Sequence, residues 1–401
     1  MTEKDKKNRP KEQARIFKKY DDLFNCSRCG TCMSFCPVYK NTKDEAVSPR
    51  GKLSLIEAIS QEKLDFTDAV SDKIYTCTMC SYCESECPSG VKVSELFGEM
   101  RQDLVDKEKY PKALDFLKRR LDEAHNVTFD TNEGRIDWVK QIPDTEAEDW
   151  LRDEAEVIYF VGCVSSFSPR AFSIPRSIVQ LFKEAKLDSG LLGEEEWCCG
   201  FPLLSSGMRE EAKKLADHNI SKVKKRGAKV LITSCPSCYH TWKYEYGKIS
   251  SEKIDFEIMH VCQYLPRLIE DGRLVLKKLE KRVAYHDPCD LGRNSGVYDE
   301  PRNLINSIPG VELVELAAHK DLANCCGGGG NLESLDPDLS GKIAECRARE
   351  IIEAGVDILV SACQQCERTL GAALKKLKQE AGGKIKVADI SELVLASIKA
   401  D

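Results

Sequence analysis

The sequence lacks the features of membrane-spanning, secreted and nucleic-acid-binding proteins. No uninterrupted apolar run approaches the roughly 18–20 residues that cross a bilayer. The first residues, MTEKDKKNRPKEQARIFKKY, are basic but contain no apolar core of the kind that a secretory signal requires. The net charge is only −6, and no basic nucleic-acid-binding footprint is present. We therefore expect a cytoplasmic protein with no nucleic-acid partner.

Signatures of nucleotide, flavin and haem binding are also missing. The glycine-rich stretch CCGGGGN at 325–331 lacks the G-K-[ST] and G-x-G-x-x-G patterns in their usual context. We expect its glycines to let the backbone approach a bound cluster or a substrate instead. A redox protein without its own flavin or haem depends on a partner for electrons.

The chain does contain 20 cysteines among its 401 residues. This number is high for ordinary cytosolic packing and low for a small disulfide scaffold. Because no secretory signal precedes them, we expect these thiols in a reducing compartment, where cysteines bind metals or carry redox chemistry.

Eight of the cysteines form two runs of the pattern C-x2-C-x2-C-x3-C-P, at 26–37 and 77–88. This doubled pattern predicts two cubane 4Fe–4S clusters, because three thiolates of each run bind one cluster and the fourth reaches the other. One cluster is expected on Cys26, Cys29, Cys32 and Cys87, and the second on Cys77, Cys80, Cys83 and Cys36. A closed zinc site is the alternative for four thiolates.

The 40 residues between the two runs predict helices rather than a small β-type ferredoxin. In SPRGKLSLIEAIS, Pro49 stands near a start, and Leu53, Ile56 and Ile59 follow at helical spacing. We expect a helical ferredoxin domain over 26–100, which resembles that of the iron–sulfur subunits of succinate dehydrogenase and fumarate reductase. A basic arm at 1–25 precedes it as a solvated tail or a docking segment, and a helical connector without evident chemistry follows at 101–155.

From residue 157 onward the sequence motifs occur twice, at a period of 126–128 residues. Strand-like runs alternate with amphipathic helical stretches, which predicts β-α-β units with parallel sheets. Each copy has five cysteines, two of them adjacent: Cys163, Cys198, Cys199, Cys235 and Cys238, then Cys289, Cys325, Cys326, Cys363 and Cys366. The cysteines fall where strands end and helices begin, the place at which open α/β sheets bind ligands. The predicted fold class is α+β multidomain: a helical ferredoxin domain, then α/β domains at 156–280 and 281–401 related by a pseudo-twofold.

The repeated pattern, a cysteine, then C-C-G, then C-x-x-C, resembles the CCG domain of the heterodisulfide reductase family. Two cubane motifs followed by two CCG domains resemble the D-type subunit of that enzyme from methanogens. The resemblance implies that each set of five cysteines binds a non-cubane 4Fe–4S cluster, with the adjacent pair serving neighbouring irons. Buried structural thiols and ordinary cubanes are the alternatives.

The resemblance further implies a disulfide oxidoreductase of methanogenesis. Electrons would pass through the two cubanes to an anionic disulfide of the CoM-S-S-CoB type, held between the two CCG clusters. The donor would be a membrane-bound b-type cytochrome or another redox subunit, which would hold the chain at the cytoplasmic face of the membrane. The alternative is an electron-transfer subunit of a 2-hydroxyacid-oxidising, glycerol-3-phosphate-oxidising or sulfite-reduction-linked membrane complex.

A few residues outside the cluster motifs are also candidates for a functional or structural role. His286, three residues before Cys289, is a candidate proton donor to a product thiolate or a hydrogen-bonded histidine at a strand end. Cys262 and Cys346 lie outside every motif and are expected to be buried thiols. Two arginines follow the first cysteine of each copy and are candidates for binding the substrate's anionic groups: Arg170 and Arg176 in the first copy, Arg293 and Arg302 in the second.

Overall fold

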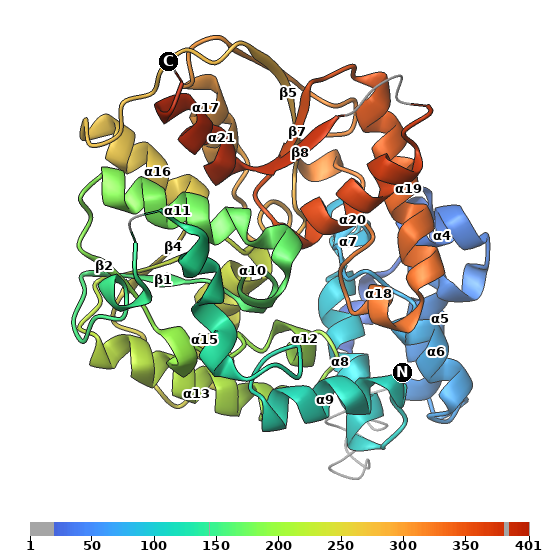
Figure 1. Cartoon of the computed structure of the whole chain (residues 1–401). Coiled ribbons are helices and arrows are strands. Elements are labelled where there is room, and N and C mark those ends of the chain that lie inside the picture. Colours follow the sequence, from blue (N-terminus) through green and yellow to red (C-terminus); the bar gives the residue numbers. More distant parts are fainter. Residues whose placement is uncertain (1–19, 144, 381–384, 401) are drawn as a thin grey trace.

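The computed structural model describes residues 20–143, 145–380 and 385–400. Most of the expected basic arm, 1–19, lies outside these described residues. Along the chain, a helical part is followed by a connector and then by two parallel sheets with their helices (Figure 1). No helix among the described residues is both long and apolar enough to cross a membrane.

The first part is helical, as the sequence predicted. Its helices are η1 (Asp21–Asn25), α3 (Thr31–Phe35), α4 (Pro37–Thr42), η2 (Glu45–Val47), α5 (Pro49–Ser60), α6 (Asp68–Tyr75), α7 (Tyr82–Ser85) and α8 (Val93–Asp106). The Ser48 side chain accepts a hydrogen bond from the Gly51 N–H, and Pro49 occupies the first turn of α5. The apolar residues at helical spacing, Leu53, Ile56 and Ile59, are buried on one face of α5.

The connector consists of α9 (Ala113–Glu123), η3 (Asn132–Gln141) and η4 (Ala147–Asp149). The 3-10 helix η3 packs against α10 (Cys163–Phe167) and η6 (Gly193–Glu195) of the first sheet domain. It buries Arg135, Trp138 and Val139 in that contact. The connector is therefore part of the wall of the first sheet domain and not a free linker.

The first sheet has four parallel strands in the order β2-β1-β3-β4. The strands are β1 (Val157–Phe160), β2 (Ser189–Leu191), β3 (Val230–Thr233) and β4 (Glu257–His260). The other helices are η5 (Pro169–Ala171), α11 (Ser173–Glu184), α12 (Phe201–Leu204), α13 (Arg209–Lys225), α14 (Pro236–His240), η7 (Thr241–Glu245), α15 (Tyr246–Ile249) and α16 (Val261–Glu270). Helices start directly after β1 and β3, which places their first residues at the carboxyl edge of the sheet.

The second sheet repeats this topology in the order β6-β5-β7-β8. Its strands are β5 (Lys281–His286), β6 (Val311–Val314), β7 (Ile358–Ser361) and β8 (Lys386–Asp389). Its helices are α17 (Asp299–Asn306), η8 (Lys320–Leu322), α18 (Leu332–Leu335), α19 (Pro337–Glu353), α20 (Gln364–Lys376) and α21 (Ile390–Ile398). The sequence repeat is thus a repeat of structure, and the predicted fold class is confirmed.

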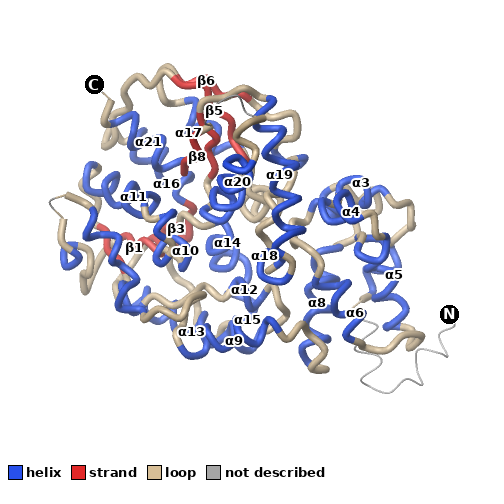
Figure 2. Tube along the Cα trace, turned by 45° about the vertical axis from the view of Figure 1, so that its right-hand side comes forward, coloured by secondary structure: helices blue, strands red, loops and turns tan. Residues whose placement is uncertain are grey.

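The two sheet domains contact each other reciprocally. Helix α11 of the first domain packs on α21 of the second, and α16 of the first packs on α17 of the second (Figure 2). In each pair, the helix after a domain's first strand meets the helix after the other domain's last strand. Two equivalent contacts of this kind are what a twofold relation produces. On the other side of the second domain, α19 packs against α4 of the ferredoxin part (Figure 1).

Candidate metal centres

The first four-cysteine set lies at the surface of the ferredoxin part. Burial raises the pKa of Cys32 to about 11, and the neighbouring thiols of Cys26, Cys29 and Cys87 add to that shift. The hydroxyl of Ser89 lies 3.2 Å from that of Ser27, so the two cysteine runs meet here. Cys29 is exposed to solvent. The structure brings together the four thiols that the spacing rule assigns to the first cubane.

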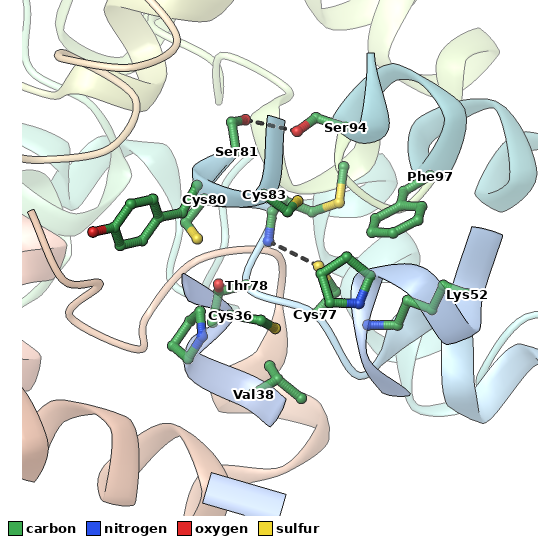
Figure 3. Close-up of a pocket in the computed structure, with 14 residues that line it drawn as sticks. Cys36, Val38, Lys52, Cys77, Thr78, Cys80, Ser81, Cys83, Ser94 and Phe97 are labelled. Atoms are coloured by element: carbon green, nitrogen blue, oxygen red, sulfur yellow. Dashed lines mark hydrogen bonds between the residues drawn. The ribbon is translucent and has the colours of Figure 1, made fainter. Parts of the chain in front are cut away.

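The second four-cysteine set lines one cavity in the interior (Figure 3). Its members are Cys36, Cys77, Cys80 and Cys83. Burial raises the pKa of Cys83 well above its ordinary value, and the other three thiols raise it further. Lys52 and Phe97 close one side of the cavity, with the Lys52 ammonium 2.6 Å from the Thr76 carbonyl oxygen. This set contains the thiols expected for the second cubane.

The first five-cysteine set gathers at the carboxyl edge of the first sheet. Cys163 begins α10 after β1, and Cys235 immediately precedes α14 after β3. Neighbouring thiols of this set shift one another's pKa, which places Cys163 beside Cys198 and Cys199 beside both Cys198 and Cys238. Cys238 likewise lowers the pKa of Cys235. All five thiols of this set are thus in one connected group, from segments up to 75 residues apart.

Gly162 makes room for this group. It has a φ of +79°, and a Cβ placed there would lie 3.2 Å from the Cys238 sulfur. A side chain at this position would therefore enter the space between the thiols.

A buried ion pair from the connector borders the first five-cysteine set, and the sequence did not predict it. The Arg135 guanidinium lies 3.7 Å from the Cys163 sulfur and 2.8 Å from the Glu196 carboxylate. Both charged side chains are 1% exposed. Glu196 also accepts hydrogen bonds from the backbone N–H groups of Val161 and Gly162.

The second five-cysteine set occupies the same edge of the second sheet. The sulfurs of Cys326 and Cys366 are 3.3 Å apart, and Cys363 precedes the first residue of α20. The Cys325 thiol raises the pKa of Cys289, which places these two cysteines side by side. The structure therefore groups the second five thiols in the same way as the first five.

His286 lies inside the second set. One ring nitrogen of His286 and the sulfurs of Cys326 and Cys366 are all within 4.8 Å of one another. Burial and the nearby Arg347 guanidinium lower the pKa of His286 to about 3. The Arg347 Nε–H points to Nδ1 of His286 at 3.3 Å, which leaves Nε2 as the protonated nitrogen of the neutral ring. The role in proton transfer that the sequence suggested stays a prediction.

The cysteine sets are connected in space. The Cys80 thiol, of the second four-cysteine set, lies in one buried cluster with Cys325 of the second five-cysteine set, and Cys325 raises the pKa of Cys80. At the seam between the two sheet domains, the thiol of Cys235 raises the pKa of Cys363. The sets therefore follow one another as outer four, inner four, second five and first five.

The glycine-rich loop after Cys326 supports one of these junctions. A Cβ on Gly329 would lie 2.5 Å from the Thr78 carbonyl oxygen, and one on Gly330 would lie 2.3 Å from that of Cys77. These glycines allow the second five-cysteine set to approach the backbone of the ferredoxin part.

The predicted anion-binding arginines have different surroundings. Arg302 is buried in ion pairs with Asp287 and Glu315, and Arg293 stacks on the Tyr82 ring with 4.3 Å from its guanidinium carbon to the ring centre. Arg176 donates to the Gln141 side chain, and Arg170 is exposed. Of the two cysteines outside the motifs, Cys262 is fully buried as expected, whereas Cys346 is exposed.

The donor sets fit iron–sulfur clusters. All twenty cysteines are free, and eighteen of them fall into the four sets, which contain sulfur as their common donor atom. The five-membered sets exceed the four donors of a structural zinc site.

Comparison with known proteins agrees with the assignment of these cysteine sets to iron–sulfur clusters. A cysteine-rich domain family matches residues 157–243 and 283–371, and a 4Fe-4S dicluster domain family matches residues 22–91. The chain therefore binds iron–sulfur clusters.

Two curated relatives and one solved structure show how far the similarity extends. The D-type subunit of the dihydromethanophenazine:CoB–CoM heterodisulfide reductase of Methanosarcina mazei is 32% identical over 400 residues, which cover 94% of each chain. The B-type subunit of the fumarate reductase (CoM/CoB) of Methanothermobacter marburgensis is 27% identical over 93% of this chain and 72% of its own length. The crystal structure of a hypothetical protein from Helicobacter pylori shares the fold with a TM-score of 0.58 and 11% identity, over 97% of this chain and 77% of that chain.

Proposed function

The chain belongs to the family of D-type heterodisulfide reductase subunits, and from this premise we propose that it is the catalytic iron–sulfur subunit of a disulfide reductase. The reaction adds two electrons and two protons to one disulfide and yields two thiols. The bound clusters supply the electrons one at a time. The substrate class is an anionic disulfide of the CoM-S-S-CoB type, since CoB and CoM occur in the names of the relatives.

We assign two cubane clusters to the four-cysteine sets and two non-cubane clusters to the five-cysteine sets. The division of the chain follows the sequence prediction: an arm at 1–25, a ferredoxin domain at 26–100, a connector at 101–155 and CCG domains at 156–280 and 281–401. Five donors around one site suit a cluster that is larger than a cube, and Gly162 keeps side-chain bulk out of the first of these sites.

The observation that carries the proposal is that the two five-cysteine sets lie on either side of the domain seam, close enough for the Cys235 thiol to raise the pKa of Cys363. Two similar sites that face each other match the two sulfurs of one disulfide, so that each site would take one sulfur. A simple relay has no need of a second matched site beyond the first. The seam is built from both domains: the Gln364 amide donates to the Ser234 hydroxyl at 2.9 Å, and the Ser237 hydroxyl donates to Asp290 at 2.6 Å.

The order of the sets supports an electron path from the surface inward. The exposed Cys29 marks the outer cubane as the entry point for a redox partner, either a membrane-bound b-type cytochrome or another electron-donating protein. The inner cubane then adjoins the second CCG site through Cys80 and Cys325. In this arrangement the partner holds the chain at the cytoplasmic face of a membrane.

His286 is the candidate for proton handling at the second CCG site. Its neutral ring has Nε2–H available to donate a hydrogen bond, and one ring nitrogen lies within 4.8 Å of the sulfurs of Cys326 and Cys366. The corresponding residue at the end of β1 is Phe160, so the first CCG site has no equivalent imidazole at this position.

The proposal is tested by reducing the disulfide CoM-S-S-CoB with the anaerobically purified protein and a reduced viologen dye. We expect two thiols per disulfide consumed and about 16 irons per chain, four for each assigned cluster. Replacing Cys199 or Cys326 by alanine is expected to remove iron and thiol formation together. A reproducible content of about eight irons that neither substitution lowers would contradict the assignment of the CCG sites.

An electron-transfer role in a membrane oxidoreductase is the second candidate. The similarity to part of a fumarate reductase favours it, because that relative is named for a different overall reaction. In that case the protein would pass electrons between dyes or partner proteins at full iron content, yet form no thiols from the disulfide.

A further inference from the structure

Each five-cysteine site has one guanidinium group near its first cysteine, fully buried for Arg135 and half-buried for Arg293. At the first site, Arg135 lies 3.7 Å from the Cys163 sulfur, and the Cys198 thiol is a further neighbour. At the second site, Arg293 stacks on Tyr82, which shares a buried cluster with Cys325, and Cys289 packs against that cluster. Both guanidinium groups therefore face the same two positions of the repeated motif.

The two arginines reach these equivalent places from different parts of the chain. Arg293 is four residues after Cys289, within the repeat itself, whereas the residue four after Cys163 is Phe167. Arg135 comes from the connector and stacks on that phenylalanine, with 5.1 Å from its guanidinium carbon to the ring centre. Where the first repeat has no arginine, the connector supplies one. A packing requirement alone does not explain why the same charge returns.

The surrounding polar groups leave both guanidinium groups oriented towards the thiols. Arg135 is held by Glu196, and Arg293 donates to the carbonyl oxygen of Ala323, the residue that corresponds to Glu196 in the second repeat. Burial opposes the charge of each arginine, but the adjacent thiols, together with Glu196 beside Arg135, outweigh it and leave the pKa of both raised. Asp290 is a carboxylate that raises the pKa of Cys289, and it accepts hydrogen bonds from Ser237 and Asn294.

Arg293 also contacts the ferredoxin part. It stacks on the Tyr82 ring. Among the neighbouring thiols, Cys80 of the inner four-cysteine set raises the pKa of Arg293 the most. Cys80, Tyr82 and Cys325 belong to one apolar cluster, against which Cys289 packs. A single cation is thus shared by the inner cubane and the second CCG site.

We propose that Arg135 and Arg293 are positioning residues that set the reduction potentials of the clusters, Arg135 for the first CCG site alone and Arg293 for the second CCG site and the inner cubane together. A fixed positive charge near a thiolate-bound cluster favours its more negative, reduced form, and this effect is strong in a buried site. This inference rests on the proposed cluster assignment. A substitution of Arg135 should change the potential of one cluster and a substitution of Arg293 that of two clusters. A general effect of mutation would not follow this pattern.

The experiment is a potentiometric titration of the full chain with its clusters, followed by electron paramagnetic resonance for each cluster separately. For Arg135→Gln we expect the ratio of reduced to oxidised cluster at a fixed potential to fall about tenfold at the first CCG site only. For Arg293→Gln we expect a fall of about the same size at the second CCG site and at the inner cubane. The outer cubane is the internal control in both variants, and Arg152→Gln, at an exposed position of the connector, is the control variant.

Two further variants keep the test decisive if a glutamine variant is unstable. Arg135→Lys and Arg293→Lys retain the charge and are expected to keep the potentials close to those of the unmodified protein. Glu196→Gln removes the negative partner of Arg135 but leaves an oxygen for the Val161 and Gly162 N–H groups, so it should shift the first CCG site in the opposite direction.

Unchanged potentials in the glutamine variants, equal shifts at all four clusters, or a Glu196→Gln shift in the same direction as Arg135→Gln would overturn the inference. Iron and sulfide per chain are measured on the same samples. A full cluster content with unchanged potentials defeats this inference alone, whereas iron missing from the CCG sites of the unmodified protein defeats the proposed function as well.

Discussion

His260, at the end of β4, makes the stability of the protein depend on pH. It is fully buried, and its Nδ1 lies 3.1 Å from the Cys262 sulfur. Burial lowers the pKa of His260 to about 4, although the backbone groups of Ser234 and Ala362 raise it. The unfolded chain, with an ordinary histidine pKa near 6.5, therefore binds this proton more readily than the folded chain does. The resulting stability is complete above pH 6.5 and is lost as the pH falls towards 4.

We expect this histidine to destabilise the folded protein by about 2 kcal/mol at pH 5 relative to pH 7.5. The measurement compares the apparent melting temperature of the unmodified protein and of His260→Gln at the two pH values. Acid damage to the clusters affects both proteins, so the informative quantity is the difference between their pH slopes. Equal slopes would show that His260 does not contribute.

At the same scale, the sequence predicted the thiol groupings better than their charged neighbours. Cysteine spacing identified all eighteen grouped cysteines because ligand sets recur at fixed intervals. Arg135 was missed because its contact, Cys163, lies 28 residues later and nothing in the polar stretch around it indicates burial. Arg302 was expected to face a substrate anion, but its ion partners Asp287 and Glu315 come from segments that the sequence does not pair with it.

At the scale of elements, the glycine-rich loop after Cys326 is a docking segment for the ferredoxin part. Gly329 has no special backbone angle to explain it, so the close approach of the Thr78 carbonyl oxygen is the reason for a glycine. Gly329→Ala is expected to cost about 1–3 kcal/mol, because the loop or the Cys77–Thr78 turn must move to accept a methyl group. It is also expected to slow electron transfer from the inner cubane to the second CCG site.

Gly341→Ala is the matched control for this prediction. Gly341 lies in α19, only twelve residues away, and a Cβ there meets no atom within 4 Å. An alanine in this helix should raise stability slightly, by up to about 1 kcal/mol. Thermal unfolding and rapid-mixing reduction of both variants make the comparison. If Gly329→Ala behaves like Gly341→Ala, the loop does not dock in the manner described.

The elements that the sequence predicted are those with strong apolar or repeated signals. The runs before Cys163, Cys235, Cys289 and Cys363 became β1, β3, β5 and β7, each of them central in its sheet. The edge strand β2, Ser189–Leu191, is three residues long and contains glycine, so it has no periodicity to detect. Its place in the sheet comes from pairing with β1, a tertiary contact.

For the whole molecule, the order of the cysteine sets predicts that the cubanes carry electrons and do not bind substrate. Cys80→Ser should abolish turnover driven by a redox partner, while the disulfide still binds at the CCG clusters and gives a new paramagnetic signal on partial oxidation. Because Cys80 lies next to Cys325, its replacement could also disturb a CCG site. Cys29→Ser, at the exposed outer set, is therefore the matched variant, and the same loss of partner-driven turnover is expected for it. If the binding signal disappears in Cys29→Ser with intact CCG clusters, this division of roles is wrong.

The pairing of the two sheet domains predicts that neither CCG site acts alone. The reciprocal helix contacts hold the domains together, and Cys235 and Cys363 approach each other at the seam, so one disulfide would be shared by both sites. Cys199→Ala should damage the first site and Cys326→Ala the second, and each should remove nearly all disulfide reductase activity. Because the sites act as a unit, the double variant should be scarcely worse than either single variant.

Cys346→Ala, at an exposed cysteine outside every set, is the control and should keep full activity. Retention of most of the activity by one single variant, with loss of its cluster confirmed by iron content and spectroscopy, would exclude a two-site mechanism. The reaction would then be assigned to the one CCG site that remains intact in that variant.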